Sequence, residues 1–327
     1  MRRLTCGAVV LLAFLTTSAN ARAAPITIGN PLLSPVASTS GSGISATLLN
    51  LTIAEPGALP TSPVSGAILS WHLQGSGGGP FRLRVLRPAG PDTYTSVGTS
   101  AAVTAAAADT QNVETFATTL PIQAGDLVAI DVVKGVRLGI TANPASVIGA
   151  IEPILVEGGT DTLDVTTAGA EWAFNAVVQP APTITAVNPK AGSFKGGTKV
   201  TITGTDLTGA SAVTFGGIAA KRFTVDSESK ITAVAPARKK LGSAPIAVTT
   251  IAGSATFSRF KLTACVVPKL KQKTLKAAKK KLKKAGCKVG KVTKVGDASA
   301  KTGVVAQQGE PAGKKLAPGT KIAVTLS

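Results

Sequence analysis

The residues with the clearest chemical potential in this sequence are lysines near its C-terminal end. Residues 265–327 hold 16 lysines and two acidic residues, a net charge of +14 out of +19 for the whole chain. Five of these lysines fall on one side of a short helical pattern: Lys276, Lys279, Lys280, Lys283 and Lys284. Such a basic face either attracts anionic polymers or only keeps a solvated helix soluble. Both interpretations stay open.

Two cysteines, Cys265 and Cys287, flank the lysine run. The third cysteine, Cys6, lies in the N-terminal export signal described below and is expected to be lost on cleavage. The two remaining cysteines of an exported chain favour one disulfide, and closing a loop of about 20 residues stabilises a small module by roughly 3 kcal/mol. Metal or redox chemistry has no partners here, because there is no C-x-x-C motif. The lone histidine, His72, is far away in sequence and is interpreted as a surface residue. We predict a structural disulfide, with no metal site and no cofactor.

A short helix must position the lysines. Thr274 is a good N-cap, because its hydroxyl can accept a hydrogen bond from the first turn. Gly286 suits the left-handed residue that ends a helix. Between them an apolar stripe recurs at helical spacing: Leu275, Ala278, Leu282 and Ala285. Runs around 289–292, 304–305 and 322–324 predict strands that pack against this stripe.

These elements agree in order and spacing with a known module. The residues that carry the likeness are Val267-Pro268, Thr274-Leu275, Ala278, Gly286, Gly303-Val304-Val305, Gln307 and Pro318-Gly319-Thr320. The segment resembles a PASTA domain. That resemblance implies a helix on a three-stranded sheet and a role in recognising peptidoglycan or related ligands. One departure is Lys276-Ala277, where the family often carries an acidic residue.

Four other patterns could suggest chemistry, and each has a plainer interpretation. Ser227–Lys230 fits S-x-x-K and Lys301–Gly303 fits K-T-G, the motifs of penicillin-recognising enzymes, but they lie in separate modules and we interpret them as chance matches. The glycine-rich run 75–79 predicts a flexible hairpin loop rather than a phosphate-binding loop. Asp161 and Asp164 are interpreted as solvated loop acids rather than calcium ligands.

The N-terminal end predicts export. Arg2 and Arg3 precede an apolar run over residues 8–15, which small residues follow. This pattern is typical of a secretory signal peptide, with cleavage expected after Ala23. No later segment is long and apolar enough to predict a transmembrane helix. We expect a secreted, extracellular protein associated with the cell envelope.

Residues 180–263 begin within a proline-rich linker, Gln179 to Pro182, and have a distinct glycine-turn pattern. Pro182 to Pro189 lead to the turn Gly196-Gly197, and Val200 and Ile202 then point into a core. Together with Val213-Thr214-Phe215-Gly216-Gly217, this pattern resembles an IPT/TIG domain, which implies an immunoglobulin-like sandwich that serves as a spacer or binding platform.

Residues 24–179 alternate apolar and polar positions between Gly, Pro and Ser turns. One predicted strand has Ala67, Leu69, Trp71 and Leu73 on one face, a second has Phe81, Leu83 and Val85, and a third has Trp172, Phe174, Ala176 and Val178. This alternation predicts half-buried strands of a β-sandwich. The strand–turn–strand pattern at 120–130 resembles jelly-roll modules of bacterial surface proteins.

We therefore predict a mainly β protein in which a jelly-roll-like sandwich precedes the IPT/TIG-like sandwich and the α+β PASTA-like module. The predicted divisions are the signal peptide 1–23, the sandwich 24–179, the IPT/TIG-like domain 180–263 and the PASTA-like domain 264–327. The favoured function is non-enzymatic attachment to cell-wall peptidoglycan or anionic wall polymers, and no nucleic-acid partner is expected. The alternatives are a wall-glycan-acting enzyme with its catalytic site in 24–179 and a purely structural secreted protein.

Overall fold

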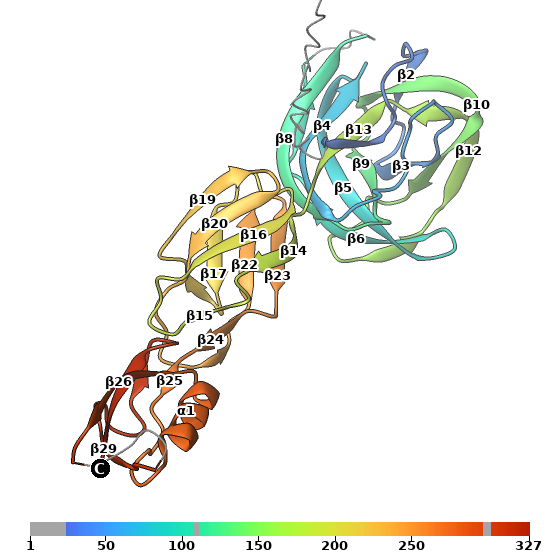
Figure 1. The fold of residues 1–327 in the computed structure, drawn as a ribbon. Helices are drawn as coiled ribbons and strands as arrows, with labels where there is room; N and C mark the ends of the chain where they lie inside the picture. Colours follow the sequence, from blue (N-terminus) through green and yellow to red (C-terminus); the bar gives the residue numbers. More distant parts are fainter. Residues whose placement is uncertain (1–23, 107–110, 297–301) are drawn as a thin grey trace, which may run out of the picture.

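The computed structural model describes residues 24–106, 111–296 and 302–327. The predicted signal peptide and its cleavage after Ala23 lie outside these residues. Strands dominate the described chain, which contains one α-helix, so the mainly β fold is confirmed. Figure 1 shows three bodies that follow one another along the molecule. Their hydrophobic cores draw on separate stretches of sequence, 26–178, 184–262 and 265–326.

The first body packs a small sheet against a long, curved one (Figure 1). The small sheet has the order β1 (Ile26–Gly29), β13 (Phe174–Pro180), β4 (Gly66–Gln74), β8 (Val113–Ile122). The long sheet has the order β11 (Thr160–Thr162), β6 (Thr93–Thr99), β5 (Gly78–Gly90), β9 (Leu127–Val132), β3 (Ala46–Thr52), β10 (Arg137–Ile151), β12 (Val165–Trp172). Two short strands extend it, with β2 (Ser38–Gly41) on β10 and β7 (Val103–Ala105) on β5.

One predicted inward face, that of β4, differs in the core between these sheets. Trp71 and Leu73 are buried as predicted, but Leu69 is only half-buried and Ile68 is fully buried in its place. The register of β4 against β8 shifts between Ile68 and Ser70. Such a bulge moves later residues to the opposite face, so strict alternation cannot be extrapolated through it.

The long sheet also has a small apolar cluster on its other face. The segment after β10 crosses this face and places Leu155 against Leu49, Leu86 and Ile151. Hydrogen bonds fix the segment at both ends, from Leu155 N to Thr47 Oγ1 at 3.0 Å and from Ser96 N to Gly159 O at 2.9 Å. The outer face of the sheet is therefore partly covered, and a hollow remains beside the cover.

The second body is built from three sheets around one core. One has the order β14 (Thr183–Asn188), β16 (Lys199–Thr205), β20 (Lys230–Val234), β19 (Arg222–Ser227). Another has the order β18 (Ile218–Ala219), β17 (Ala212–Phe215), β22 (Ile246–Thr250), β23 (Gly253–Phe257), and the third joins β15 (Ala191–Ser193), β24 (Lys261–Thr263), β21 (Gly242–Ser243). Val200 and Ile202 are fully buried, as predicted. Gly196 and Gly197 both have positive φ, at 78° and 80°, which explains why glycine occupies this turn.

The third body places one helix against a three-stranded sheet, as predicted. The helix is α1 (Leu275–Lys284), and the sheet has the order β26 (Lys288–Lys294), β29 (Lys321–Leu326), β27 (Val305–Gln308). A small additional pair joins β25 (Cys265–Val266) and β28 (Lys315–Leu316). The apolar stripe of α1 contributes Leu275, Ala278 and Leu282 to the core of this body.

Candidate functional site

The five lysines predicted to form a basic face all lie on α1 and are all exposed: Lys276, Lys279, Lys280, Lys283 and Lys284. With about 100° of rotation per residue, they occupy an arc of roughly 140° away from the buried stripe. We call this surface the lysine face. Lys281 is also exposed but falls outside the arc. The lysine face is therefore one continuous side of the helix.

Both ends of α1 are closed by local interactions. Thr274 Oγ1 accepts a hydrogen bond from Ala277 N at 3.4 Å, which satisfies one donor of the first turn. At the other end Gly286 has a φ of 72°, and Cys287 N donates to Leu282 O at 2.8 Å. A Cβ at Gly286 would lie 2.9 Å from Ala264 O, so the close backbone approach also requires glycine.

The lysine face has no counter-ions among the described residues. The described carboxylate of this body, Glu310, pairs with Lys314 at 2.7 Å. Within the described chain, no carboxylate comes within 4.0 Å of a lysine of the face. A hollow of about 580 Å³ opens beside the face, and Lys279, Lys283 and Lys288 line it together with Gly286 and Val289. This surface is therefore complementary to anionic ligands.

The predicted disulfide is present and joins Cys265 to Cys287. Their Cα atoms lie 4.7 Å apart and 22 positions apart in sequence. Cys265 is in β25, where the body begins, and Cys287 follows the end of α1. Both cysteines are buried within the core. The helix is thus held to the first strand by a covalent bond in addition to its apolar stripe.

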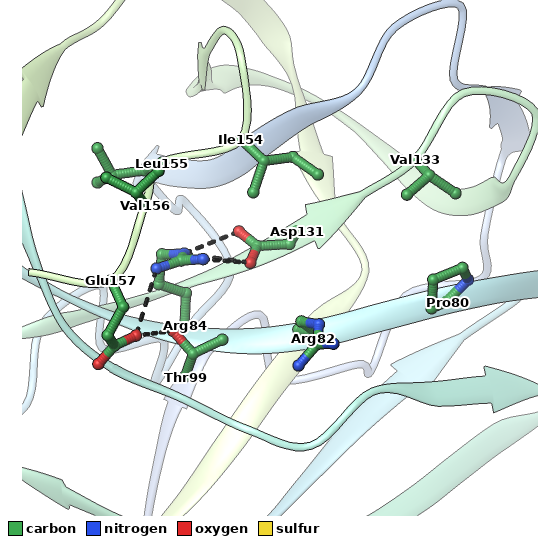
Figure 2. A pocket seen from close by; sticks show the side chains of 10 residues that line it. All are labelled: Pro80, Arg82, Arg84, Thr99, Asp131, Val133, Ile154, Leu155, Val156 and Glu157. Atoms are coloured by element: carbon green, nitrogen blue, oxygen red, sulfur yellow. Dashed lines mark hydrogen bonds and ion pairs between the residues drawn. The ribbon is translucent and has the colours of Figure 1, made fainter. Parts of the chain in front are cut away.

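A second candidate site lies on the outer face of the long sheet in the first body. Figure 2 shows this pocket between β5 and the segment over residues 154–157, with Arg84 near its centre. Its volume is about 400 Å³. We call it the sandwich pocket, and the residues that face its space are Pro80, Arg82, Thr99, Val133, Ile154 and Glu157.

Arg84 and Asp131 form the saturated floor of the sandwich pocket. Arg84 Nη2 lies 2.6 Å from Asp131 Oδ2, and Arg84 Nε lies 2.9 Å from Asp131 Oδ1. Asp131 Oδ1 also accepts from Thr47 Oγ1 at 2.7 Å, and Arg84 Nη1 donates to Ser96 Oγ. Both ionic side chains are about 95% buried or more. Asp131 therefore has little capacity left to act as a catalytic acid or base.

The other residues singled out in the sequence are not brought together. His72 is half-buried rather than a surface residue. Its Nδ1 lies 2.6 Å from Asn175 Oδ1 on the neighbouring strand. Asp161 lies in strand β11 rather than in a loop, and its Oδ1 accepts from Thr162 N. Asp164 Oδ2 accepts from Glu152 N, so each acid is exposed and bonded to nearby backbone. No group of three or more His, Cys, Asp or Glu is arranged for a metal within the described chain.

The glycine-rich run has different surroundings from those expected, whereas the Ser227–Lys230 match does not. The glycine-rich run 75–79 is not a hairpin loop: it carries the chain from β4 in the small sheet to β5 in the long sheet, and Gly77 exchanges two 3.0 Å hydrogen bonds with Arg137. Ser227 to Lys230 form the turn between β19 and β20. Lys301 of the K-T-G match lies outside the described residues.

The alternation along β5 is a sequence signal for the sandwich pocket. Phe81, Leu83 and Val85 are fully buried on one face of β5. Arg82 and Arg84 alternate with them and must therefore share the opposite face. A buried arginine on that face requires an acidic partner, but the partner, Asp131, is 47 positions away.

Comparison with known domain families identifies the second and third bodies. Residues 182–264 match the family model of the IPT/TIG domain, and residues 266–327 match that of the PASTA domain. The chain carries an IPT/TIG domain followed by a PASTA domain. PASTA domains generally bind peptidoglycan-related ligands. The two domains together indicate an extracellular or cell-envelope protein with a binding or structural role.

Similarity to solved structures is loose. SGBP-B from a complex xyloglucan utilization locus in Bacteroides uniformis aligns at 16% identity and a TM-score of 0.24, covering 72% of this chain and 49% of that chain. The full extracellular region of plexin A4 aligns at 14% identity and a TM-score of 0.25, covering 67% and 18%. This chain therefore spans about half of the first protein, and the low TM-scores do not indicate a common fold over the aligned length. No curated protein matches the sequence significantly.

No helix within the described ranges is long and apolar enough to span a bilayer, and α1 itself has ten residues.

Proposed function

We propose that this protein is exported and attaches to peptidoglycan or anionic polymers of the cell envelope through the lysine face of its PASTA domain, without catalysing a reaction. The observation that carries the proposal is the unpaired charge of that face. Five exposed lysines share one side of α1, and no described carboxylate pairs with them. Among the described residues, the charge of this helix is therefore left for an external anion.

The type of cation favours attachment by diffuse charge. Lysine is a compact, strongly hydrated charge on a flexible stem, whereas arginine forms planar, bidentate contacts. A row of lysines can therefore follow a polymer whose charged groups are spaced irregularly. Exposed charges lose their mutual attraction as salt screens them beyond about 10 Å at 0.1 M. Attachment of this kind weakens steeply as the salt concentration rises.

The support for a non-enzymatic role comes from how the polar groups of the first body are used. Asp131 accepts hydrogen bonds from Arg84 and Thr47. His72 is bound to Asn175. Glu171 accepts from Asn30 at 2.7 Å and from Asn143 at 3.0 Å. Asp131 and Glu171 thus stabilise the sandwich, and neither is left as the free carboxyl group that an acid–base pair for glycan hydrolysis would need on each side of a substrate.

The test is co-sedimentation of the full chain with purified cell-wall sacculi over a salt series, before and after their anionic polymers are removed. A variant replaces all five lysines of the lysine face by Gln. Its control replaces five exposed lysines of the IPT/TIG domain by Gln, which removes the same total charge: Lys190, Lys195, Lys199, Lys239 and Lys240. We expect the first variant to lose binding and the control to keep most of it.

Three outcomes separate the ligands. Binding that survives about 0.15 M salt and polymer removal indicates that peptidoglycan itself is recognised. Binding that disappears with either treatment indicates attachment to the anionic polymers. Equal losses in the two variants, or no sedimentation at low salt, would contradict attachment through the lysine face.

A further inference from the structure

The sandwich pocket holds one cation and one anion whose hydrogen-bonding capacity is largely unused. Arg82 Nη1 donates to Ser100 O at 3.3 Å, and Arg82 makes no ion pair within the described chain. Glu157 has a side chain that is 60% exposed. Its Oε2 accepts from Thr99 Oγ1 and lies 3.6 Å from Arg84 Nη1, which leaves Oε1 without a described partner. Donors and an acceptor thus face the same space.

The saturated Arg84–Asp131 pair separates these two groups. In Figure 2 dashed lines connect Arg84 to Asp131 and to Glu157. Arg82 lies farther along β5, and no dashed line joins it to the other residues drawn. The buried pair is neutral as a unit and its hydrogen bonds are satisfied, so it shapes the floor but recognises little. The pocket therefore presents a positive end at Arg82 and a negative end at Glu157.

The distance between the two ends fits a short chain molecule. Arg82 and Arg84 are at i and i+2 of β5, which places them about 7 Å apart along the strand. Glu157 lies against Arg84 on the far side from Arg82. An extended tripeptide spans about 10 Å. Apolar side chains of Pro80, Val133 and Ile154 line the space between and beside the ends.

The charge pattern favours a zwitterion over a neutral ligand. A neutral ligand would remove water from Arg82 and Glu157 without supplying opposite charges, which is unfavourable. A ligand with a carboxylate and an ammonium group supplies both, and the planar guanidinium of Arg82 matches a carboxylate. The apolar walls suit small aliphatic side chains.

We propose that the sandwich pocket binds a short peptide with free termini, its carboxylate at Arg82 and its ammonium group at Glu157. The site belongs to the first body and does not depend on attachment through the PASTA domain. It would make the sandwich a recognition module rather than a spacer.

The test is calorimetric titration of the full chain with trialanine, N-acetyl-trialanine and trialanine amide. Each solvated ion pair between the protein and the peptide raises the binding affinity by up to about fivefold. We expect each cap and each of the variants Arg82→Gln and Glu157→Gln to weaken binding by about that factor. Arg82→Gln should become insensitive to the C-terminal amide, and Glu157→Gln should become insensitive to the N-acetyl group. Arg222→Gln, at an exposed position of the IPT/TIG domain, is the control.

Each variant is expected to lose sensitivity to one particular cap. A folding defect would instead weaken the binding of all three peptides alike, so the two causes can be told apart. Three results would overturn the proposal: no heat of binding at millimolar trialanine, equal affinity for the free and capped peptides, or binding of neutral maltotriose that Arg82→Gln weakens. Loss of sacculus binding in the lysine-face variant with trialanine binding retained would show that the two sites act separately.

Discussion

The sandwich pocket and the lysine face treat positive charge in opposite ways. In the pocket, Arg84 is buried, and the side chains of Asp131 and Ser96 accept hydrogen bonds from its guanidinium. On α1, five ammonium groups extend into solvent with no described counter-ion. The first arrangement contributes order to the fold, and the second contributes a long-range field.

The difference shows what each kind of charge can do. A buried, paired charge is costly to disturb, because removing one partner leaves the other without compensation in an apolar surrounding. An exposed, unpaired charge adds little to stability but attracts anions over about a Debye length. Substitutions in the buried Arg84–Asp131 pair should therefore change the free energy of unfolding. Substitutions in the lysine face should change the binding of anions.

The largest expected effect is on the buried pair. Arg84→Met leaves the Asp131 carboxylate buried and unpaired, and we expect a loss of about 3–5 kcal/mol in the free energy of unfolding of the sandwich. Both tryptophans, Trp71 and Trp172, belong to this body, so urea unfolding followed by tryptophan fluorescence reports on it selectively. The double variant Arg84→Met/Asp131→Leu should recover most of the loss. If Arg84→Met unfolds at the same urea concentration as the unchanged protein, the buried pair does not stabilise the sandwich, and the contrast with the lysine face is wrong.

The next effect concerns the disulfide that holds the lysine face in place. Replacing both Cys265 and Cys287 by Ala should cost the PASTA domain about 3 kcal/mol, because a 22-position loop is no longer closed in the unfolded chain. Hydrogen exchange of α1 amides should then accelerate about 100-fold, while amides of the sandwich strands stay unchanged. Unchanged exchange in α1 would show that its apolar stripe alone fixes the helix.

A smaller effect should separate stability from binding on α1. Lys280 has lysine neighbours four positions away on both sides, Lys276 and Lys284, and such like-charge pairs destabilise a helix. We expect Lys280→Glu to stabilise α1 by about 0.5–1 kcal/mol and to weaken sacculus binding. Hydrogen exchange and co-sedimentation measure the two quantities.

The control for that prediction is Lys281→Glu. It makes the same change in charge outside the lysine face, and its positions i−4 and i+4 are both alanines, which leaves Lys284 at i+3 as its one lysine neighbour at this spacing. It should therefore give less stabilisation than Lys280→Glu and a smaller loss of binding. Equal behaviour of the two variants would mean that total charge, not its arrangement on α1, governs attachment.

The smallest effect is a pH dependence confined to the sandwich. Burial, followed by the charge of Asp92, raises the pKa of the Tyr94 phenol above the ordinary tyrosine value of about 10. The raised pKa means that the folded state keeps its proton longer than the unfolded state. The contribution to stability is therefore complete below pH 10 and declines as pH rises through the folded pKa. Tyr94→Phe should flatten this alkaline limb.

Absorbance at 295 nm checks the assignment directly, because Tyr94 is the only tyrosine of the chain. Its titration midpoint should lie above 10 in the folded protein and return to about 10 in urea. A midpoint that does not move on unfolding would contradict the burial described for this ring.

The features of the PASTA domain were predictable because their causes are local. Thr274, the apolar stripe and Gly286 act within one helix, and the lysine face follows from helical periodicity alone. The disulfide prediction required only that two cysteines outside the predicted signal peptide lie near each other in sequence. The glycine pair Gly196-Gly197 likewise predicted its own turn from the backbone angles that it permits.

The features of the sandwich that could not be predicted depend on contacts between distant segments. The sandwich pocket combines β5, β6, β9 and the segment after β10, and Arg84 meets Asp131 across 47 positions. His72 meets Asn175 across 103 positions, which no periodicity indicates. The bulge at Ile68 changed the inward face of β4 because neighbouring strands shifted register, not because of any signal within the strand.

The position of the disulfide determines how the PASTA domain would respond to mechanical pulling. If the lysine face is attached to a wall polymer, tension between that polymer and the IPT/TIG domain enters at α1 and leaves through β25. The bond from Cys265 to Cys287 joins β25 to the third residue after the end of α1. A pull would therefore be transmitted largely through covalent bonds, and the three-stranded sheet of the domain would remain outside the stretched path.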